Sequence, residues 1–254
     1  MHLCVDWLRE TLVKKLQALG PQTHKDFRIF ITSEINPRLP TGLLRISDII
    51  VAEALTGIKA TLSRFFSSIA KDRFSQPVRN RLYLLVGWTH AVIQERLRFV
   101  PNGWTEAYEF TEADATHALD VVDSLLEEKG RQSQLDPEKL PWDAIRSTLC
   151  KGVFGGRVTQ EKDQQVLDEL VNFLFVPKSF DVDFKLVPQA AEIPALPEGS
   201  SREACMEWIA SLPQHTDPTW IGLDSSAELE REKRMAEDVV KKVSLIQAKC
   251  EKEE

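Results

Sequence analysis

The 254-residue sequence has few cysteines and lacks any long apolar run. No run approaches the roughly 20 apolar residues that cross a bilayer, and the first residues show no basic-then-apolar signal peptide. The cysteines are scattered, so they have no metal-ligand spacing and are expected to be reduced thiols of a cytosolic protein. They are Cys4, Cys150, Cys205 and Cys250. We therefore expect a cytoplasmic protein without a membrane segment.

The motifs that hold nucleotide phosphates are also missing. Neither Gly-x-x-x-x-Gly-Lys-Ser/Thr nor Gly-x-Gly-x-x-Gly occurs in the sequence. Gly155-Gly156-Arg157 is too short and follows a predicted helix, whereas a phosphate cradle needs successive backbone N–H groups after a strand. We instead expect Gly155 and Gly156 to form a tight turn that requires positive φ. The chain is thus expected to bind no nucleotide and no other cofactor by itself.

No residue pattern indicates a catalytic or metal site. The five histidines form no cluster with acids or cysteines. His90 lies among apolar residues of a predicted helix, which favours a hydrogen-bonded core histidine over a ligand. Asp120 and Asp123 share one helix, but a solvated face explains them better than a carboxylate pair for acid–base work. The net charge of −7 argues against a broad nucleic-acid surface.

What the sequence does contain is helical periodicity, most informative between Leu82 and Phe110. Apolar residues recur at three- and four-residue steps from position 78 to 97, and further apolar residues on a second side predict burial over much of the circumference. Pro101 and Asn102-Gly103 predict the end of this helix and a turn. Three aromatic residues follow, Trp104, Tyr108 and Phe110. Because such rings bury large areas, we expect a packed connector.

The polar end of this helix, Gln94 to Arg98, permits two interpretations. It is either a solvated helix end, with its arginines near the negative end of the helix dipole, or a packed polar contact surface. The residue types alone leave both open.

The N-terminal part predicts a fragment of an α/β domain. Residues 3–19 have helical spacing, and a second amphipathic helix is expected over 58–67. Phe27 to Thr32 is a nearly continuous apolar run that fits a strand buried on both faces, and Ile49 to Val51 indicates a second such strand. Two strands cannot form a doubly wound sheet with a covered core, so we expect the chain to begin in the middle of a domain.

After Ser75 the pattern is helical. Helices are predicted over 111–128, 141–151, from about 159 to 174, and over 202–212. Pro188 to Ser201 is an expected linker. A charged helix is predicted from Ser225 or Ser226 almost to the end, with sparse apolar residues that would need a partner. These residues are Leu229, Met235, Val239, Val243 and Ile246.

Several long sequence islands occur in an order that resembles one family. They are Phe27 to Pro37, Leu82 to Phe110, Leu140 to Ala144, and Gly155 to Val158. Together they are similar to the C-terminal part of a dynein heavy chain motor, from His2 to about Val187 and more weakly from Trp208 to Leu223. The segments closer to cytoplasmic than to axonemal dyneins are Glu34 to Pro37, Gln94 to Arg98, and Lys178 to Asp181.

The resemblance implies a mainly α fold in three parts. Residues 1–68 would be a partial α/β large subdomain of the sixth AAA+ module, with two buried strands. Residues 69–187 would be the helical lid bundle of that module. Residues 188–254 would be the mostly helical start of a C-terminal domain, cut short. For Gln94 to Arg98 the resemblance favours packing within the lid or between modules.

The resemblance also implies site positions. Phe27 to Asn36 resembles the sensor strand of an AAA+ module, whose polar end residue helps to place the attacking water; Thr32, Ser33 and Asn36 are the candidates. Leu43-Leu44-Arg45 resembles the segment that offers an arginine to a neighbouring nucleotide, a role that suits the planar guanidinium. Alternatively Arg45 forms a structural ion pair, which the resemblance favours because the sixth module is degenerate and does not hydrolyse nucleotide.

The implied function is that of an ATP-driven, minus-end-directed microtubule motor, with ATP and Mg²⁺ bound by earlier modules outside this chain. This part would pass rigid-body motion around the ring. Its partner would be the rest of the heavy chain, and microtubules and dynein accessory chains would be reached through the whole protein. One alternative is a stand-alone helical protein-binding module derived from an AAA+ lid, with an exposed stripe over residues 225–250. The missing phosphate-binding loop disfavours an autonomous ATPase.

Overall fold

A computed structural model describes residues 5–19, 23–33, 39–50, 56–129, 135–197 and 201–250. The chain divides into two compact units, residues 1–54 and 55–254. The three-part division at residues 68/69 and 187/188 stays a prediction, and the helix that begins at Ile58 belongs to the second unit. Each unit is described by itself below.

The first unit contains a small helical cluster. One continuous helical stretch confirms the helix predicted for residues 3–19, and a short helix follows over Thr41–Arg45. Leu8, Val13 and Leu43 are its buried residues. The elements are α1 (Val5–Trp7), the π-helical η2 (Leu8–Leu12), α2 (Val13–Ala18) and α3 (Thr41–Arg45).

The two predicted buried strands are absent from the described residues, which corrects that part of the expected fold. Residues 27–33 have no regular structure, and Phe30 is 90% exposed. Ile49 and Ile50 are also exposed, and Val51 lies outside the described residues. A strand buried on both faces needs neighbouring strands for its backbone and helices for its side chains, and the described part of this unit supplies no neighbouring strand. An apolar run predicts that a segment is buried, but it does not identify the residues that bury it.

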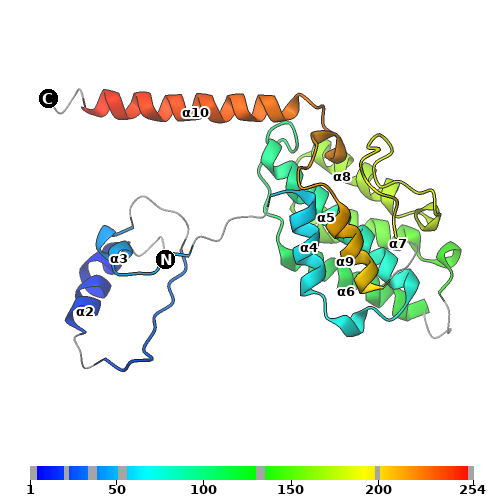
Figure 1. The fold of residues 1–254 in the computed structure, drawn as a ribbon, viewed down its shortest axis with the longest axis horizontal. Helices are drawn as coiled ribbons and strands as arrows, with labels where there is room; N and C mark the ends of the chain where they lie inside the picture. Colours follow the sequence, from blue (N-terminus) through cyan, green and yellow to red (C-terminus); the bar gives the residue numbers. More distant parts are fainter. Residues whose placement is uncertain are drawn as a thin grey trace. The chain divides into compact units, whose positions relative to one another are not determined.

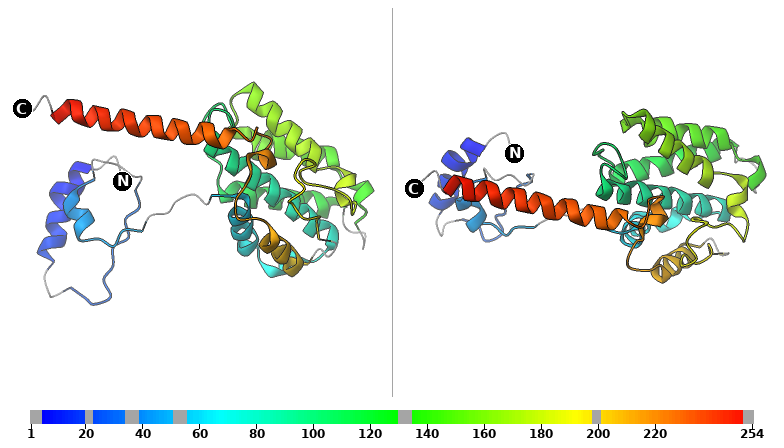
Figure 2. Two further views of the ribbon diagram at one scale, coloured as in Figure 1. Left: turned by 45° about the horizontal axis from the view of Figure 1, so that its top comes forward. Right: turned by 90° about the horizontal axis from the view of Figure 1, so that it is seen from above.

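The second unit is a helical bundle built around α5 (Figure 1). Helices α4, α6 and α8 pack against α5, and α9 packs against α4. Figure 2 shows the bundle from two further directions, with the last helix extending from it. The long helices are α4 (Ile58–Ser68), α5 (Pro77–Arg96), α6 (Glu112–Lys129), α8 (Glu161–Leu174), α9 (Arg202–Ser211) and α10 (Ala227–Cys250), and α7 (Trp142–Ser147) is short.

Short helical turns join these helices. The π-helical η6 (Thr148–Val153) continues α7, which confirms a helix over about 141–151 in a wider form. The 3-10 turns are η3 (Lys71–Arg73), η4 (Leu97–Phe99), η5 (Pro137–Lys139), η7 (Gly155–Arg157), η8 (Pro177–Phe180) and η9 (Pro218–Ile221).

Several helix starts follow from local sequence. Ser201 accepts a hydrogen bond from the Ala204 N–H and caps α9. The Asp114 carboxylate accepts from the Thr111 N–H at 2.7 Å at the start of α6. Helix α8, predicted from about residue 159, begins after Gln160, without a side-chain cap.

Helix α5 is buried over nearly its whole length, which confirms the second apolar side read from the sequence. Its largest fully buried side chains are Tyr83 and Trp88. A helix buried all round lies at the centre of a bundle rather than on its surface. The core around it is continuous and contains residues from α4 to the start of α10.

Gly155 and Gly156 lie in the 3-10 turn η7, and neither has positive φ, so the expected positive-φ turn is wrong. The requirement at Gly155 is space. A Cβ placed there would lie 1.5 Å from the carbonyl oxygen of Cys150, because the wide π-helical turn η6 brings that carbonyl against Gly155. At Gly156 the nearest atom would be 3.6 Å away, an ordinary contact.

Helix α10 is the least buried long helix. Beyond its first turns, Met235, Val239, Val240 and Val243 are each about half exposed or more, as the predicted need for a partner implies. Valine loses rotamer freedom in a helix, so propensity alone supports such a stretch poorly. None of the described helices is long and apolar enough to span a membrane.

Candidate functional site

Hydrogen bonds and ring contacts join the end of α5 to the connector after it, residues 95–110. Trp104, Tyr108 and Phe110 are buried, and their ring centroids lie 5.9 to 6.0 Å apart in pairs. The Trp104 Nε1–H donates to the Ile93 carbonyl at 3.0 Å, and Gln94 Nε2 donates to the Phe110 carbonyl at 2.6 Å. The expected packed connector is confirmed.

Asp163, in the first turn of α8, holds the connector in place. Its carboxylate accepts from the Thr105 N–H at 3.0 Å, the Thr105 hydroxyl at 2.6 Å and the Tyr108 hydroxyl at 2.6 Å. Burial opposes its ionisation, but these hydrogen bonds and the charge of Arg96 outweigh burial and lower the pKa of Asp163. Sequence reasoning missed this residue, because an acid in the first turn of a helix is ordinary.

Arg96 ends α5 inside the molecule, with 6% of its surface exposed. Its Nε donates to the Gly103 carbonyl at 2.9 Å, its Nη1 donates to the Ile221 carbonyl, and its guanidinium lies 5.3 Å from the centre of the Trp104 ring. Burial lowers the pKa of Arg96 to about 10, against the opposing effect of Asp163, so it stays charged at neutral pH. The solvated helix end is therefore wrong here, and packing within the bundle is observed.

Glu95 is more buried still, with 2% exposed. One carboxylate oxygen accepts the Gly57 N–H at 2.8 Å, and the other pairs with Arg98. A buried carboxylate is retained only when it is paired and hydrogen-bonded, and both conditions are met.

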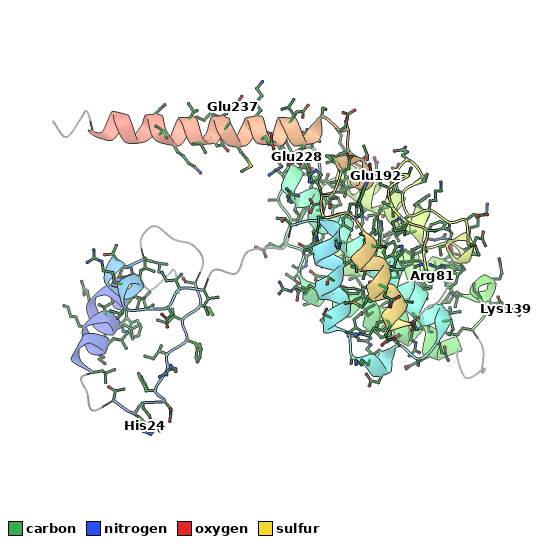
Figure 3. The ribbon with its side chains drawn as sticks, viewed as in Figure 1. His24, Arg81, Lys139, Glu192, Glu228 and Glu237 are labelled. Carbon is green, nitrogen blue, oxygen red and sulfur yellow. The ribbon has the colours of Figure 1, made fainter. Side chains whose placement is uncertain are left out.

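The first turns of α10, residues 227–234, are called its root below, and they bind to the same segment, residues 95–110. Arg234 Nη1 donates to the Val100 carbonyl at 2.6 Å, and Asn102 Nδ2 donates to Glu230 at 2.6 Å. Arg98 lies 4.0 Å from Glu228. Figure 3 labels Glu228 at this root and Glu237 farther along the exposed part of the helix.

The site positions predicted from the sequence belong to the first unit. Asn36 lies outside the described residues. Arg45 is exposed at the end of α3, and no ion pair joins it to another side chain in the described part of the chain. Thr32 and Ser33 are exposed in the irregular segment 27–33. Their nucleotide-related roles stay predictions.

Asp120 and Asp123 have different surroundings. Asp123 was expected on a solvated face, but it accepts hydrogen bonds from Arg73 at 2.6 Å and from the Tyr83 hydroxyl at 2.7 Å, whereas Asp120 is exposed as expected. Burial and Asp123 raise the pKa of Tyr83 to about 12. Burial raises the pKa of the free thiols of Cys150 and Cys205, which disfavours the thiolate form. Among the residues that the structure describes, no cluster of His, Cys, Asp or Glu side chains could hold a metal ion.

His90 lies in the core, with 1% exposed, stacked on Phe154 at 6.3 Å between ring centroids. The core position confirms the expectation, but its Nδ1 has no hydrogen-bond partner among the described residues. Burial lowers the pKa of His90 to about 4.

This histidine predicts a loss of stability in acid. The folded protein keeps the imidazole neutral down to about pH 4, whereas the imidazole of the unfolded chain takes up a proton near pH 6.5. The free energy of unfolding is therefore unaffected by His90 above about pH 6.5 and falls as the pH drops toward 4. The expected loss is roughly 3 kcal/mol, measured as the free energy of unfolding in urea at pH 7 and pH 4. His90→Leu should remove this part of the pH dependence. An equal fall in both proteins would contradict the assignment to His90.

Comparison with known proteins identifies the family. The family model described as the dynein heavy chain AAA lid domain matches residues 79–227, so it continues past residue 187. Relatives named "Dynein heavy chain, cytoplasmic" are 44% identical over 232 residues in Dictyostelium discoideum, covering 90% of this chain, and 41% identical over 258 residues in Paramecium tetraurelia, covering all of it.

A relative from Plasmodium falciparum, named "Dynein heavy chain-like protein 1", is 40% identical over 195 residues, which are 73% of this chain and 4% of that protein. The chain spans 5% to 6% of the length of the first two relatives. The family model matches more than half of this chain. The chain belongs to the dynein heavy chain family.

Proposed function

We propose that this chain acts as part of a cytoplasmic dynein heavy chain, an ATP-driven, minus-end-directed microtubule motor of the cytoplasm and cytoskeleton. The support is the names of its relatives, which are cytoplasmic dynein heavy chains at 34% to 44% identity over most of the chain. Its partner would be the rest of the heavy chain ring. Microtubules and accessory chains would be reached through the whole protein.

Within that motor, the segment would be a non-catalytic lid that transmits conformational change. The observation that carries this role is the continuous core around α5, which extends from α4 to the start of α10, together with the buried and hydrogen-bonded Glu95 and Arg96 at the end of α5. Close-packed helices move as one body instead of deforming. ATP and Mg²⁺ would be bound by other modules of the heavy chain.

The domain proposal keeps residues 1–68 as the end of the large subdomain of the sixth AAA+ module, 69–187 as its lid and 188–254 as the start of the C-terminal domain. The apolar runs at Phe27 and Ile49 would then pair with strands of the same module. Asn36 and Arg45 would occupy sensor and arginine positions in a module that does not hydrolyse ATP.

One observation favours a second candidate, a stand-alone helical protein-binding module. The stripe of Val239, Val240 and Val243 on α10 is exposed, which a partner helix would cover. The size of the native polypeptide separates the two candidates. A denaturing blot of a cell extract, probed with an antibody against residues 82–110, should show a band roughly twenty times larger than 28.9 kDa, because the chain is about a twentieth of its relatives. A band at 28.9 kDa would instead support the binding module.

The non-catalytic role predicts that the 254-residue chain does not bind nucleotide. Titration with a fluorescent ATP analogue and Mg²⁺ should give no saturable signal at micromolar concentrations, because no phosphate-binding loop is present. Saturable binding that unlabelled ATP displaces would overturn this role.

A further inference from the structure

Two parts of the chain that are distant in sequence, the start of α4 and the start of α10, bind to one short segment at the end of α5. We propose that residues 95–103 form a clasp that couples the start of α4, where the chain enters the second unit, to the root of α10, where it leaves the bundle. The clasp deepens the proposed transmission role and rests on it for its biological meaning. The coupling itself follows from contacts that the structure describes.

The first contact set holds the start of α4. Gly57 donates its N–H to Glu95 at 2.8 Å, and Ile58 donates its N–H to the Thr216 hydroxyl at 2.9 Å. The first N–H groups of a helix have no partner inside the helix, so side chains from elsewhere determine how firmly this end is held. Gly57 has φ of +94°, a conformation that suits glycine, and its N–H thereby reaches the buried carboxylate.

The second contact set crosses the clasp. Glu95 pairs with Arg98, and Arg98 lies 4.0 Å from Glu228 at the root of α10. Glu228 also pairs with Arg231, whose guanidinium lies 5.9 Å from the centre of the Phe99 ring. The Glu95 end is buried and the Glu228 end is partly exposed, so the charges are screened less than those of a surface pair.

The third contact set ties α10 to backbone atoms. Arg234 of α10 donates to the Val100 carbonyl, and Arg96 donates to the carbonyl of Ile221 in η9, the turn that precedes α10. A carbonyl cannot rotate away as a side chain does, so the Arg234 bond holds the first turns of α10 to the clasp and the Arg96 bond holds η9 to it. The path from Gly57 to α10 therefore passes through residues 95–103 and needs no contribution from α6 or α7.

Amide hydrogen exchange of the 254-residue chain, resolved by residue, tests the coupling. Glu228→Gln and, separately, Arg234→Gln alter only the α10 side. Each is expected to speed exchange at the Gly57 and Ile58 amides about fivefold or more, because contacting residues share interaction energy. Glu95→Gln is expected to speed exchange in residues 227–232 by a similar factor.

Glu237→Gln, on the exposed part of α10, is the matched control and should change neither region. If each variant speeds exchange only at its own end, the clasp is overturned. Glu228→Gln changes a side chain that is 23% exposed, so the test stands even if Glu95→Gln does not fold. The blot and the nucleotide titration test the proposed function independently, so their failure is distinguishable from failure of the clasp.

Discussion

Gly155→Ala is expected to abolish stable folding of the second unit or to cost at least about 4 kcal/mol of unfolding free energy. The new Cβ would lie 1.5 Å from the Cys150 carbonyl oxygen and 2.6 Å from its carbonyl carbon, and both are backbone atoms that no rotamer change can move. Relief requires displacement of the π-helical turn η6, which packs against α6 and α8. Close-packed interiors transmit such a displacement instead of absorbing it.

The neighbouring glycine supplies the control. At Gly156 an added Cβ would meet its nearest atom, the Lys151 carbonyl oxygen, at 3.6 Å, so Gly156→Ala should leave stability within about 0.5 kcal/mol. Thermal unfolding followed by circular dichroism would measure both variants. Equal melting temperatures for the two alanine variants would contradict the packing of η7 against η6.

Asp163→Ala is expected to cost about 3 to 5 kcal/mol, the range for removing one partner of a buried charged network. The substitution leaves the Thr105 N–H and the hydroxyls of Thr105 and Tyr108 without their common acceptor, and it leaves the buried Arg96 without its nearby opposite charge. The urea dependence of Trp fluorescence would report the loss, since Trp104 lies in this connector. Asp143→Asn, at a side chain that is 98% exposed, is the control.

The pH dependence of Asp163 has a definite sign. The folded-state pKa of Asp163 lies below the ordinary value. The ionised carboxylate therefore contributes its full stabilisation above about pH 4, and this stabilisation is lost as the pH falls further. Asp163→Asn should therefore flatten the stability curve below pH 4, a range distinct from the His90 effect between pH 6.5 and 4. An unchanged slope in this variant would show that another carboxylate carries the acid sensitivity.

Much of the second unit is predictable from its sequence because periodicity reports burial directly. The steps of three and four residues in α5 predicted a helix with apolar residues on more than one side, and its burial followed. Pro101 and Asn102-Gly103 marked the end of that helix by local chemistry alone. Such signals depend only on residues that are close in sequence, so they can be read without knowing which residues pack against the helix.

The site was only partly predictable. The aromatic connector was visible as a group of large rings, but its anchor, Asp163, lies 58 residues beyond Thr105 and resembles an ordinary first-turn acid. Glu95 and Arg96 were open to two interpretations, because a polar helix end gives no sign of whether its partners are water or carbonyl groups. The need for glycine at position 155 was visible in sequence, but its reason was misread as positive φ.

The sequence by itself determined the family, the helices and their apolar faces, and the absence of a phosphate-binding loop, since each is written in residue order and spacing. Tertiary structure decided which polar groups are buried and paired: Glu95 with Gly57 and Arg98, Arg96 with the carbonyls of Gly103 and Ile221, and Asp163 with the connector. It also decided that the apolar runs at Phe27 and Ile49 form no strands within the described residues. The physical reason is the same in both cases: a buried charge or a strand is stable only with a partner, and sequence spacing does not specify a partner that is distant along the chain.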